Sequence, residues 1–149
     1  MGLKKKRMRP LSLPLFAASW YFQTVETTGQ EWVVDARGCA PGALQKLSTL
    51  KNLFGQLTQQ LGLLPLGEGQ WHVFEGHAGI TGLQMLAESH LAIHSFPEFG
   101  YAALSVYCCK PCARPDFEAL LRHWLGAQEL EVSCIIRRCG ARPQGNEAP

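Results

Sequence analysis

The chain has 149 residues, of which 46% are hydrophobic and 17% are charged, and it carries a formal net charge of +2. This length and composition are typical of one globular domain, and no apolar run reaches the roughly 18 to 20 residues that a membrane-spanning helix requires. Five of the fourteen basic residues lie at positions 4–9, which leaves nine basic residues against twelve acidic ones and a net charge of −3 for the rest. Since a negative body is a poor partner for a phosphate backbone, we expect no nucleic-acid partner, and the lack of a long apolar run predicts no membrane-spanning segment.

The two ends of the chain are expected to lie outside the folded domain. Residues 1–25 are predicted to be a disordered basic extension, because Pro10 and Pro14 interrupt the short apolar part and leave no continuous core of a secretory signal. Residues 26–140 are predicted to form a single domain, and residues 141–149 are predicted to form a flexible tail.

The first predicted elements are a strand and a long helix. Residues 31–37 place two β-branched valines beside Trp32, which is typical of a strand, and Gly38 ends it. Residues 41–61 then repeat apolar side chains at intervals of three and four. This spacing predicts one amphipathic helix, with a proline in its first turn and a glycine at its end.

Several strands and a second helix follow. Alternating or continuous apolar residues predict strands at residues 70–75, 83–87, 89–94, 101–109 and 129–136. The segment Gly79-Ile80-Thr81-Gly82 is predicted to be a turn that leads into a buried strand at residues 83–87. Asp116 is predicted to begin the second helix, because four apolar residues behind it share one helical face. This order of elements favours a two-layer α+β sandwich, with an antiparallel sheet and helices on one face.

Six cysteines raise the possibility of disulfides or a zinc site. Without an export signal we expect reduced thiols and a cytoplasmic location. Cys108, Cys109 and Cys112 form a cluster that contains a CxxC pair, but Cys134 and Cys139 are separated by four residues and no short-spaced histidine pair lies in a loop. We therefore expect no metal, and a zinc-binding protein remains an alternative.

The densest chemistry lies in residues 87–101, AESHLAIHSFPEFGY, which combine two histidines, two carboxylates and two serines. Ser89 lacks the flanking glycines of a hydrolase nucleophile elbow. His90 and His94 have the spacing of a zinc-protease pair, but Leu91 replaces the glutamate that such a protease needs. Taken singly, these histidines could be partly buried structural residues and Glu98 a solvated loop residue, so only their order indicates a specific function.

That order, over residues 87–103, closely resembles the signature of the small bacterial and archaeal S-adenosylmethionine decarboxylases, which are pyruvoyl-dependent enzymes of spermidine biosynthesis. A looser resemblance extends over residues 31–137. The resemblance implies that the precursor cuts itself between Glu88 and Ser89, by attack of the Ser89 hydroxyl on the Glu88 carbonyl. It also implies that Ser89 then becomes a pyruvoyl group at a new N-terminus.

A pyruvoyl group would meet a need that is visible in the residues themselves. Decarboxylation of an amino acid requires an electron sink, and no side chain supplies one. Pyridoxal phosphate would need an anchoring lysine, and the lysines beyond the N-terminal segment are Lys46, Lys51 and Lys110. The first two are expected to face water on the predicted helix. A pyruvoyl carbonyl needs no lysine, and its formation would leave chains 1–88 and 89–149.

The resemblance also implies roles for other residues. His94 matches the histidine that acts as general acid or base in self-processing, and Thr81 stands where the family usually has a processing serine. Cys109 matches the cysteine that returns a proton to the substrate carbon, with Cys108 as the neighbouring alternative. The expected substrate-binding residues are a carboxylate for the ribose hydroxyls and two rings for the adenine, namely Glu98, Phe74 and Phe96. The resemblance further implies a homodimer of processed protomers.

Some positions depart from the family pattern. Threonine, tryptophan, aspartate and glycine are usual where this chain has Ser95, Phe96, Ser105 and Lys110. The segment before Gly79 is also one residue longer than is typical. These departures keep two alternatives open, a pyruvoyl-dependent ornithine or arginine decarboxylase on the same scaffold and a non-catalytic interaction protein. Retention of Glu98 and of aromatic residues at positions 74 and 96 favours the nucleoside substrate.

Overall fold

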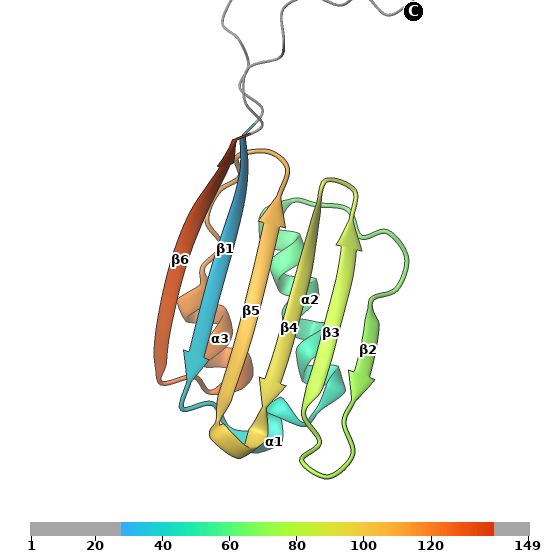
Figure 1. Ribbon diagram of the computed structural model, residues 1–149, viewed down its shortest axis with the longest axis vertical. Coiled ribbons are helices and arrows are strands. Elements are labelled where there is room, and N and C mark those ends of the chain that lie inside the picture. The colour runs from blue at the N-terminus through green and yellow to red at the C-terminus, as the bar shows by residue number, and fades with distance from the viewer. Residues whose placement is uncertain (1–27, 139–149) are drawn as a thin grey trace, which may run out of the picture.

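The computed structural model describes residues 28–138 (Figure 1). Its elements in chain order are β1 (Thr28–Arg37), α1 (Pro41–Leu44), α2 (Leu47–Leu61), β2 (Gln70–Val73), β3 (Ile80–Leu86), β4 (Ser89–Phe96), η1 (Pro97–Phe99), β5 (Tyr101–Cys108), α3 (Phe117–Leu125) and β6 (Glu129–Arg138). The predicted N-terminal extension, the predicted C-terminal tail and Cys139 lie outside the described residues.

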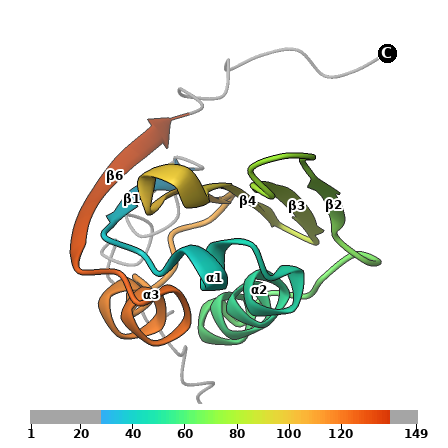
Figure 2. The same ribbon diagram turned by 90° about the horizontal axis from the view of Figure 1, so that it is seen from below.

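The strands form one sheet in the order β2-β3-β4-β5-β1-β6. Every neighbouring pair is antiparallel. The helices α1, α2 and α3 all lie on one face of this sheet, as Figure 2 shows. The predicted two-layer α+β sandwich is therefore confirmed, and the other face of the sheet is left open.

The hydrophobic core lies between the helices and the covered face of the sheet. Leu50, Leu53 and Leu57 of α2 and Phe117 of α3 are fully buried there. Burial of each such side chain stabilises the fold by about 1.5 to 3 kcal/mol. Within residues 28–138, no helix is long and apolar enough to cross a membrane.

Alternation along the central strands divides their side chains between the two faces. In β4 the buried side chains, which face the helices, are Ser89, Leu91, Ile93 and Ser95. The side chains that point to the open face are those between them, His90, Ala92, His94 and Phe96. The two histidines of the motif therefore share the open face, whereas the motif's first serine faces the core.

The single helix predicted over residues 41–61 is in fact two helices. Residue Lys46 is extended, with φ −99° and ψ 104°, and serves as the N-cap of α2. The Leu44 carbonyl, at the end of α1, accepts a hydrogen bond of 2.9 Å from the Ser95 hydroxyl of β4. The apolar spacing continues across the break because both helices bury their leucines in the same core, so periodicity alone did not reveal it.

The prediction of a turn at residues 79–82 is wrong, because three of these residues belong to β3. Gly82 pairs with Trp71 in β2, and a Cβ at Gly82 would lie 2.2 Å from a Trp71 ring carbon. The glycine is therefore required by packing against the ring. The strand is also not fully buried as predicted, since Leu83 is 49% and Met85 61% exposed on the uncovered face.

The second predicted helix is confirmed at its start. The Asp116 carboxylate accepts a 3.0 Å hydrogen bond from the Ala119 backbone N–H, which is the usual role of an N-cap aspartate. The buried residues of α3 include Phe117, Leu120 and Leu121, as predicted. Trp124, which was predicted to lie on the same face, is only partly buried.

Candidate active site

The Glu88-Ser89 peptide bond lies at the start of β4, directly after the two-residue turn that joins β3 to β4. The turn is held from both sides. The Ala87 N–H donates a 2.9 Å hydrogen bond to the Leu64 carbonyl, and the Cys109 N–H donates a 2.9 Å hydrogen bond to the Glu88 carbonyl. The carbonyl of this peptide bond is therefore oriented by a backbone donor from the end of β5.

Ser89 is buried, with 8% of its surface exposed. Its hydroxyl donates to the Tyr107 carbonyl and lies 3.6 Å from the Cys108 Sγ. The Ser89 hydroxyl is thus withdrawn from water, and the carbonyl of the preceding residue already has a hydrogen-bond donor. Tyr107 acts here through its backbone, so no side-chain pattern could have identified it.

A cavity of about 520 Å³ lies beside this bond. It is lined by Glu88, Ser89, His90, Tyr107 and Cys109, together with apolar residues of β3. The His90 and Tyr107 rings are stacked, with centroids 5.4 Å apart and planes inclined by 22°. No catalytic role is predicted for His90 from the motif, although its position next to Ser89 and the alternation of β4 are sufficient to place it at this cavity.

The two candidate proton donors differ in access. Cys109 is exposed and lines the cavity, whereas Cys108 is 1% exposed and lies against Ser89 in the core.

Burial and a hydrogen bond with Cys108 raise the pKa of Cys112 to about 12, so that this thiol stays protonated at neutral pH. Within residues 28–138, no three histidine, cysteine or acidic side chains are gathered as metal ligands.

Thr81 and His94 form a second cluster. They are directly opposite each other in the register of β3 and β4, and the Thr81 Oγ1 lies 2.9 Å from the His94 Nδ1. Both side chains point to the open face of the sheet. This contact fixes the orientation of the imidazole ring, which a general acid or base requires.

A second cavity, of about 320 Å³, is lined by Thr81 and His94 together with Phe74, Phe96 and Glu98. Phe96 stacks on Tyr101, with ring centroids 5.6 Å apart and planes inclined by 24°. The Tyr101 hydroxyl donates to the Asp35 carboxylate, and this hydrogen bond raises the pKa of Tyr101. The Phe96 ring thus has a neighbour that is itself held in place.

Phe74 reaches the second cavity from a short loop. The Phe74 N–H donates a 2.8 Å hydrogen bond to the Gly79 carbonyl, which closes the loop between β2 and β3. Within this loop Ala78 has φ 52°, a left-handed conformation that is unfavourable for alanine. The loop therefore holds Phe74, which is 51% exposed, at the rim of the cavity.

The eight candidate site residues thus fall into two groups at opposite ends of β4. Ser89 and His94 are five residues apart, which corresponds to about 17 Å along a strand, and their side chains point to opposite faces. The group at the Ser89 cavity consists of Glu88, Ser89 and Cys109. The group at the second cavity consists of Phe74, Thr81, His94, Phe96 and Glu98. One chain does not bring the two groups together.

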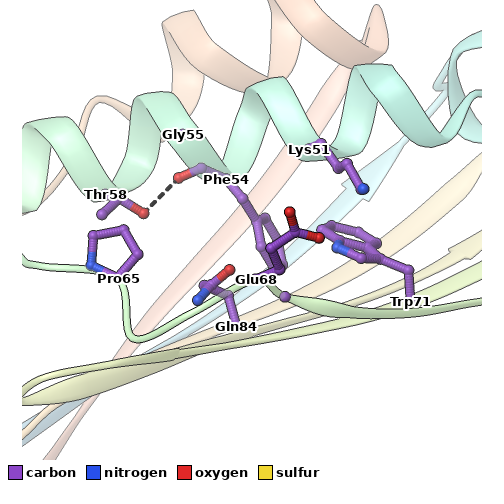
Figure 3. Close-up of a pocket in the computed structure, with 9 residues that line it drawn as sticks. Lys51, Phe54, Gly55, Thr58, Pro65, Glu68, Trp71 and Gln84 are labelled. Atoms are coloured by element: carbon purple, nitrogen blue, oxygen red, sulfur yellow. Dashed lines mark hydrogen bonds between the residues drawn. The ribbon is translucent and has the colours of Figure 1, made fainter.

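A third cavity, of about 290 Å³, lies on the helix side between α2 and the β2–β3 edge of the sheet (Figure 3). Phe54 and Trp71 pack together there, with ring centroids 4.9 Å apart, and Lys51 and Glu68 also line the cavity. None of the predicted site residues lines it. Among the described residues, no buried polar side-chain atom lacks a hydrogen-bond partner, so no unsatisfied group there indicates a ligand.

The fold and the site together define a class: an α+β sandwich with a buried serine directly after a tight turn between two strands. A family model described as S-adenosylmethionine decarboxylase matches residues 30–138. The chain belongs to this family.

Individual relatives agree with this assignment. The S-adenosylmethionine decarboxylase proenzyme of Shouchella clausii is 33% identical over 117 residues, which cover 78% of this chain and 89% of the relative. The proenzyme of the same name from Thermococcus gammatolerans is 35% identical over 92 residues, which cover 62% of this chain. The chain thus spans about 63% of the length of that archaeal relative.

A solved structure supports the fold. The crystal structure of the adenosylmethionine decarboxylase from Aquifex aeolicus is similar, with a TM-score of 0.63 and 21% sequence identity, over 82% of this chain and 99% of that one. At this identity the similarity demonstrates a shared fold.

Proposed function

We propose that this chain is the precursor of a pyruvoyl-dependent S-adenosylmethionine decarboxylase that cuts itself between Glu88 and Ser89. The observation that carries the proposal is the buried Ser89 hydroxyl beside a carbonyl that accepts a hydrogen bond from the Cys109 N–H. Membership of a family whose relatives are named proenzymes supports it. The product, decarboxylated S-adenosylmethionine, would serve spermidine biosynthesis.

The cleavage needs only this chain and water. The Ser89 Oγ bonds to the Glu88 carbonyl carbon, the carbon–nitrogen bond breaks, and the hydroxyl proton moves to the freed amine. The Cys109 N–H donates to the oxygen that gains negative charge, as in an oxyanion hole. Ser89 then loses its α-proton, the bond between its Cβ and Oγ breaks, and Glu88 leaves with a new C-terminal carboxylate. Water finally replaces the Ser89 nitrogen, which is released as ammonia.

The residues around Ser89 fit the resulting group. The position opens onto a cavity that also contains Cys109, and a pyruvoyl carbonyl there supplies the electron sink for decarboxylation. We assign to the Cys109 thiol the return of a proton to the substrate carbon. The five cysteines in the described part of the chain are free thiols, which supports a reducing compartment such as the cytoplasm.

The second cavity suits the adenosine part of the substrate. Its two aromatic rings are accessible for stacking, since Phe74 is 51% and Phe96 37% exposed. The Glu98 carboxylate at the same cavity can accept hydrogen bonds from ribose hydroxyls. Two rings beside a carboxylate match an adenine and its ribose together, whereas ornithine has no flat group and arginine has no ribose, so these residues favour the nucleoside.

The substrate is tested by release of carbon dioxide from S-adenosylmethionine, ornithine and arginine, each offered separately to the full chain. We expect turnover of S-adenosylmethionine alone. Loss of one stacked ring in Phe96→Ala is expected to raise KM about threefold to tenfold. Phe99→Ala is the matched control, because this neighbouring ring is 76% exposed and does not line the cavity. Turnover of ornithine or arginine would contradict the assignment.

We propose further that the active enzyme is a homodimer in which each site uses residues of both protomers. His94 stands about 17 Å along the strand from Ser89 and cannot reach the bond that it is expected to help cut. The open face between the two groups exposes apolar side chains, with Val33 at 38%, Leu83 at 49% and Met85 at 61%. A second copy packed on this face would cover them and, by two-fold symmetry, could bring its His94 end to the Ser89 cavity.

Complementation tests the shared site. Ser89→Ala and His94→Ala chains, each expressed alone, are expected to remain uncut. When the two are co-expressed, the His94→Ala chain has an intact Ser89 and meets an intact histidine on its partner, so it should be cut. Mass spectrometry distinguishes the two precursors and their fragments. If the co-expressed His94→Ala chain stayed uncut, this result would contradict the shared site.

A further inference from the structure

A lysine that the family pattern does not predict holds the side chain of Glu88. The Lys110 Nζ lies 2.5 Å from the Glu88 Oε1, an ion pair between the residue after Cys109 and the turn that joins β3 to β4. The two side chains are 67% and 46% exposed. Exposed pairs of this kind contribute little to the stability of a fold, so the direct effect of this pair is on the position of the Glu88 side chain.

The ion pair is the second of two contacts that restrain Glu88. The backbone N–H of Cys109 binds the Glu88 carbonyl at 2.9 Å, and the next residue, Lys110, binds the carboxylate of the same residue. A residue held at both its carbonyl and its side chain loses rotational freedom. The carbonyl direction relative to Ser89 is therefore restricted before any bond is formed, which lowers the entropic part of a barrier.

The charge of Lys110 also has the right sign for the reaction. Negative charge develops on the Glu88 carbonyl oxygen during attack, and after elimination Glu88 carries two carboxylates. No lysine or arginine is among the described residues that line the Ser89 cavity. Lys110, just outside it, is thus a cation paired with the side chain of the residue on which the negative charge develops, and in an exposed position its attraction for that charge weakens with salt.

We propose that Lys110 is a positioning residue for self-cleavage, which it accelerates by holding Glu88 through their ion pair. This inference rests on the proposed function, because it concerns the rate of the same cut.

The experiment follows cleavage of newly made full-length chain in a cell-free translation reaction, sampled over time and analysed by gel and mass spectrometry. In Lys110→Met, cleavage at low salt is expected to be slower by roughly threefold to fivefold, the upper part of the range open to an exposed ion pair that acts on a barrier. Lys110→Arg keeps the charge and is expected to cut within about twofold of the wild-type rate. Lys51→Met, which removes a lysine from α2, is the matched control and should cut like the wild type.

A double-mutant cycle separates the ion pair from a general effect of either substitution. Glu88→Gln is expected to slow cleavage as Lys110→Met does, and the double variant should be no slower than the slower single variant. Added salt should slow the wild type and leave Lys110→Met unchanged. Unaltered melting of each variant, followed by circular dichroism, excludes loss of folding as the cause.

The outcomes are distinct. If the wild type cuts and Lys110→Met cuts at the same rate, or if the two single losses multiply in the double variant, the role of Lys110 is overturned. If the wild-type chain stays whole under all conditions, it is the proposed function that fails.

Discussion

Replacement of Ser89 with alanine is expected to yield one uncut chain without decarboxylase activity. The variant loses the oxygen that attacks the Glu88 carbonyl and, with it, the ester whose elimination would lead to the pyruvoyl group. It should still fold, because the lost hydrogen bond from the Ser89 hydroxyl to the Tyr107 carbonyl is worth only about 1 kcal/mol. Intact mass spectrometry and carbon dioxide release measure the two consequences separately.

Ser48→Ala serves as the control for this experiment. Ser48 lies on the exposed side of α2, far in the fold from the turn between β3 and β4. This variant should give fragments 1–88 and 89–149 in the same proportion as the wild type. Decarboxylation by an intact Ser89→Ala chain would refute both the cleavage and the pyruvoyl group.

Replacement of Cys109 with alanine is expected to leave cleavage intact and to lower decarboxylation by about 10² to 10⁴-fold, the usual contribution of a positioned proton donor. The two effects separate because the hydrogen bond to the Glu88 carbonyl comes from the Cys109 backbone, which alanine keeps, whereas the proton for the substrate carbon would come from the thiol. The measurements are fragment formation by mass spectrometry and turnover of the cut enzyme.

Cys108→Ala is the matched comparison for that second experiment. Its thiol is buried against Ser89, so its loss should affect packing more than turnover. If Cys109→Ala retained full turnover and Cys108→Ala lost it, the donor role would move to Cys108.

The periodicity of the chain was sufficient for the fold class. Alternation in the strands and the spacing of leucines around Leu50 and Leu57 follow directly from burial on one face of an element. The same logic misjudged residues 79–82, where two glycines suggested a turn. Gly82 is in fact a strand residue that makes room for Trp71, and this need depends on a neighbouring strand that local sequence does not specify.

Sequence patterns named candidate site residues, but they did not indicate how these residues are arranged in space. The motif order pointed to Ser89 and His94 as parts of one chemical apparatus. In the structure an odd spacing of five residues sends their side chains to opposite faces and opposite ends of β4. A second copy of the chain therefore becomes necessary to the proposed mechanism, a requirement that the motif does not contain.

What the sequence by itself determined is the local chemistry: which side chains follow one another in residues 87–103, which residues alternate in a strand and which line a helix. These depend on neighbours within a few positions. Only the tertiary structure decided that the Cys109 backbone and the Lys110 side chain meet Glu88, twenty-two residues before that lysine. The reason is physical, since contacts between strands depend on the register of the whole antiparallel sheet, which is set by burial of the common core against α2 and α3.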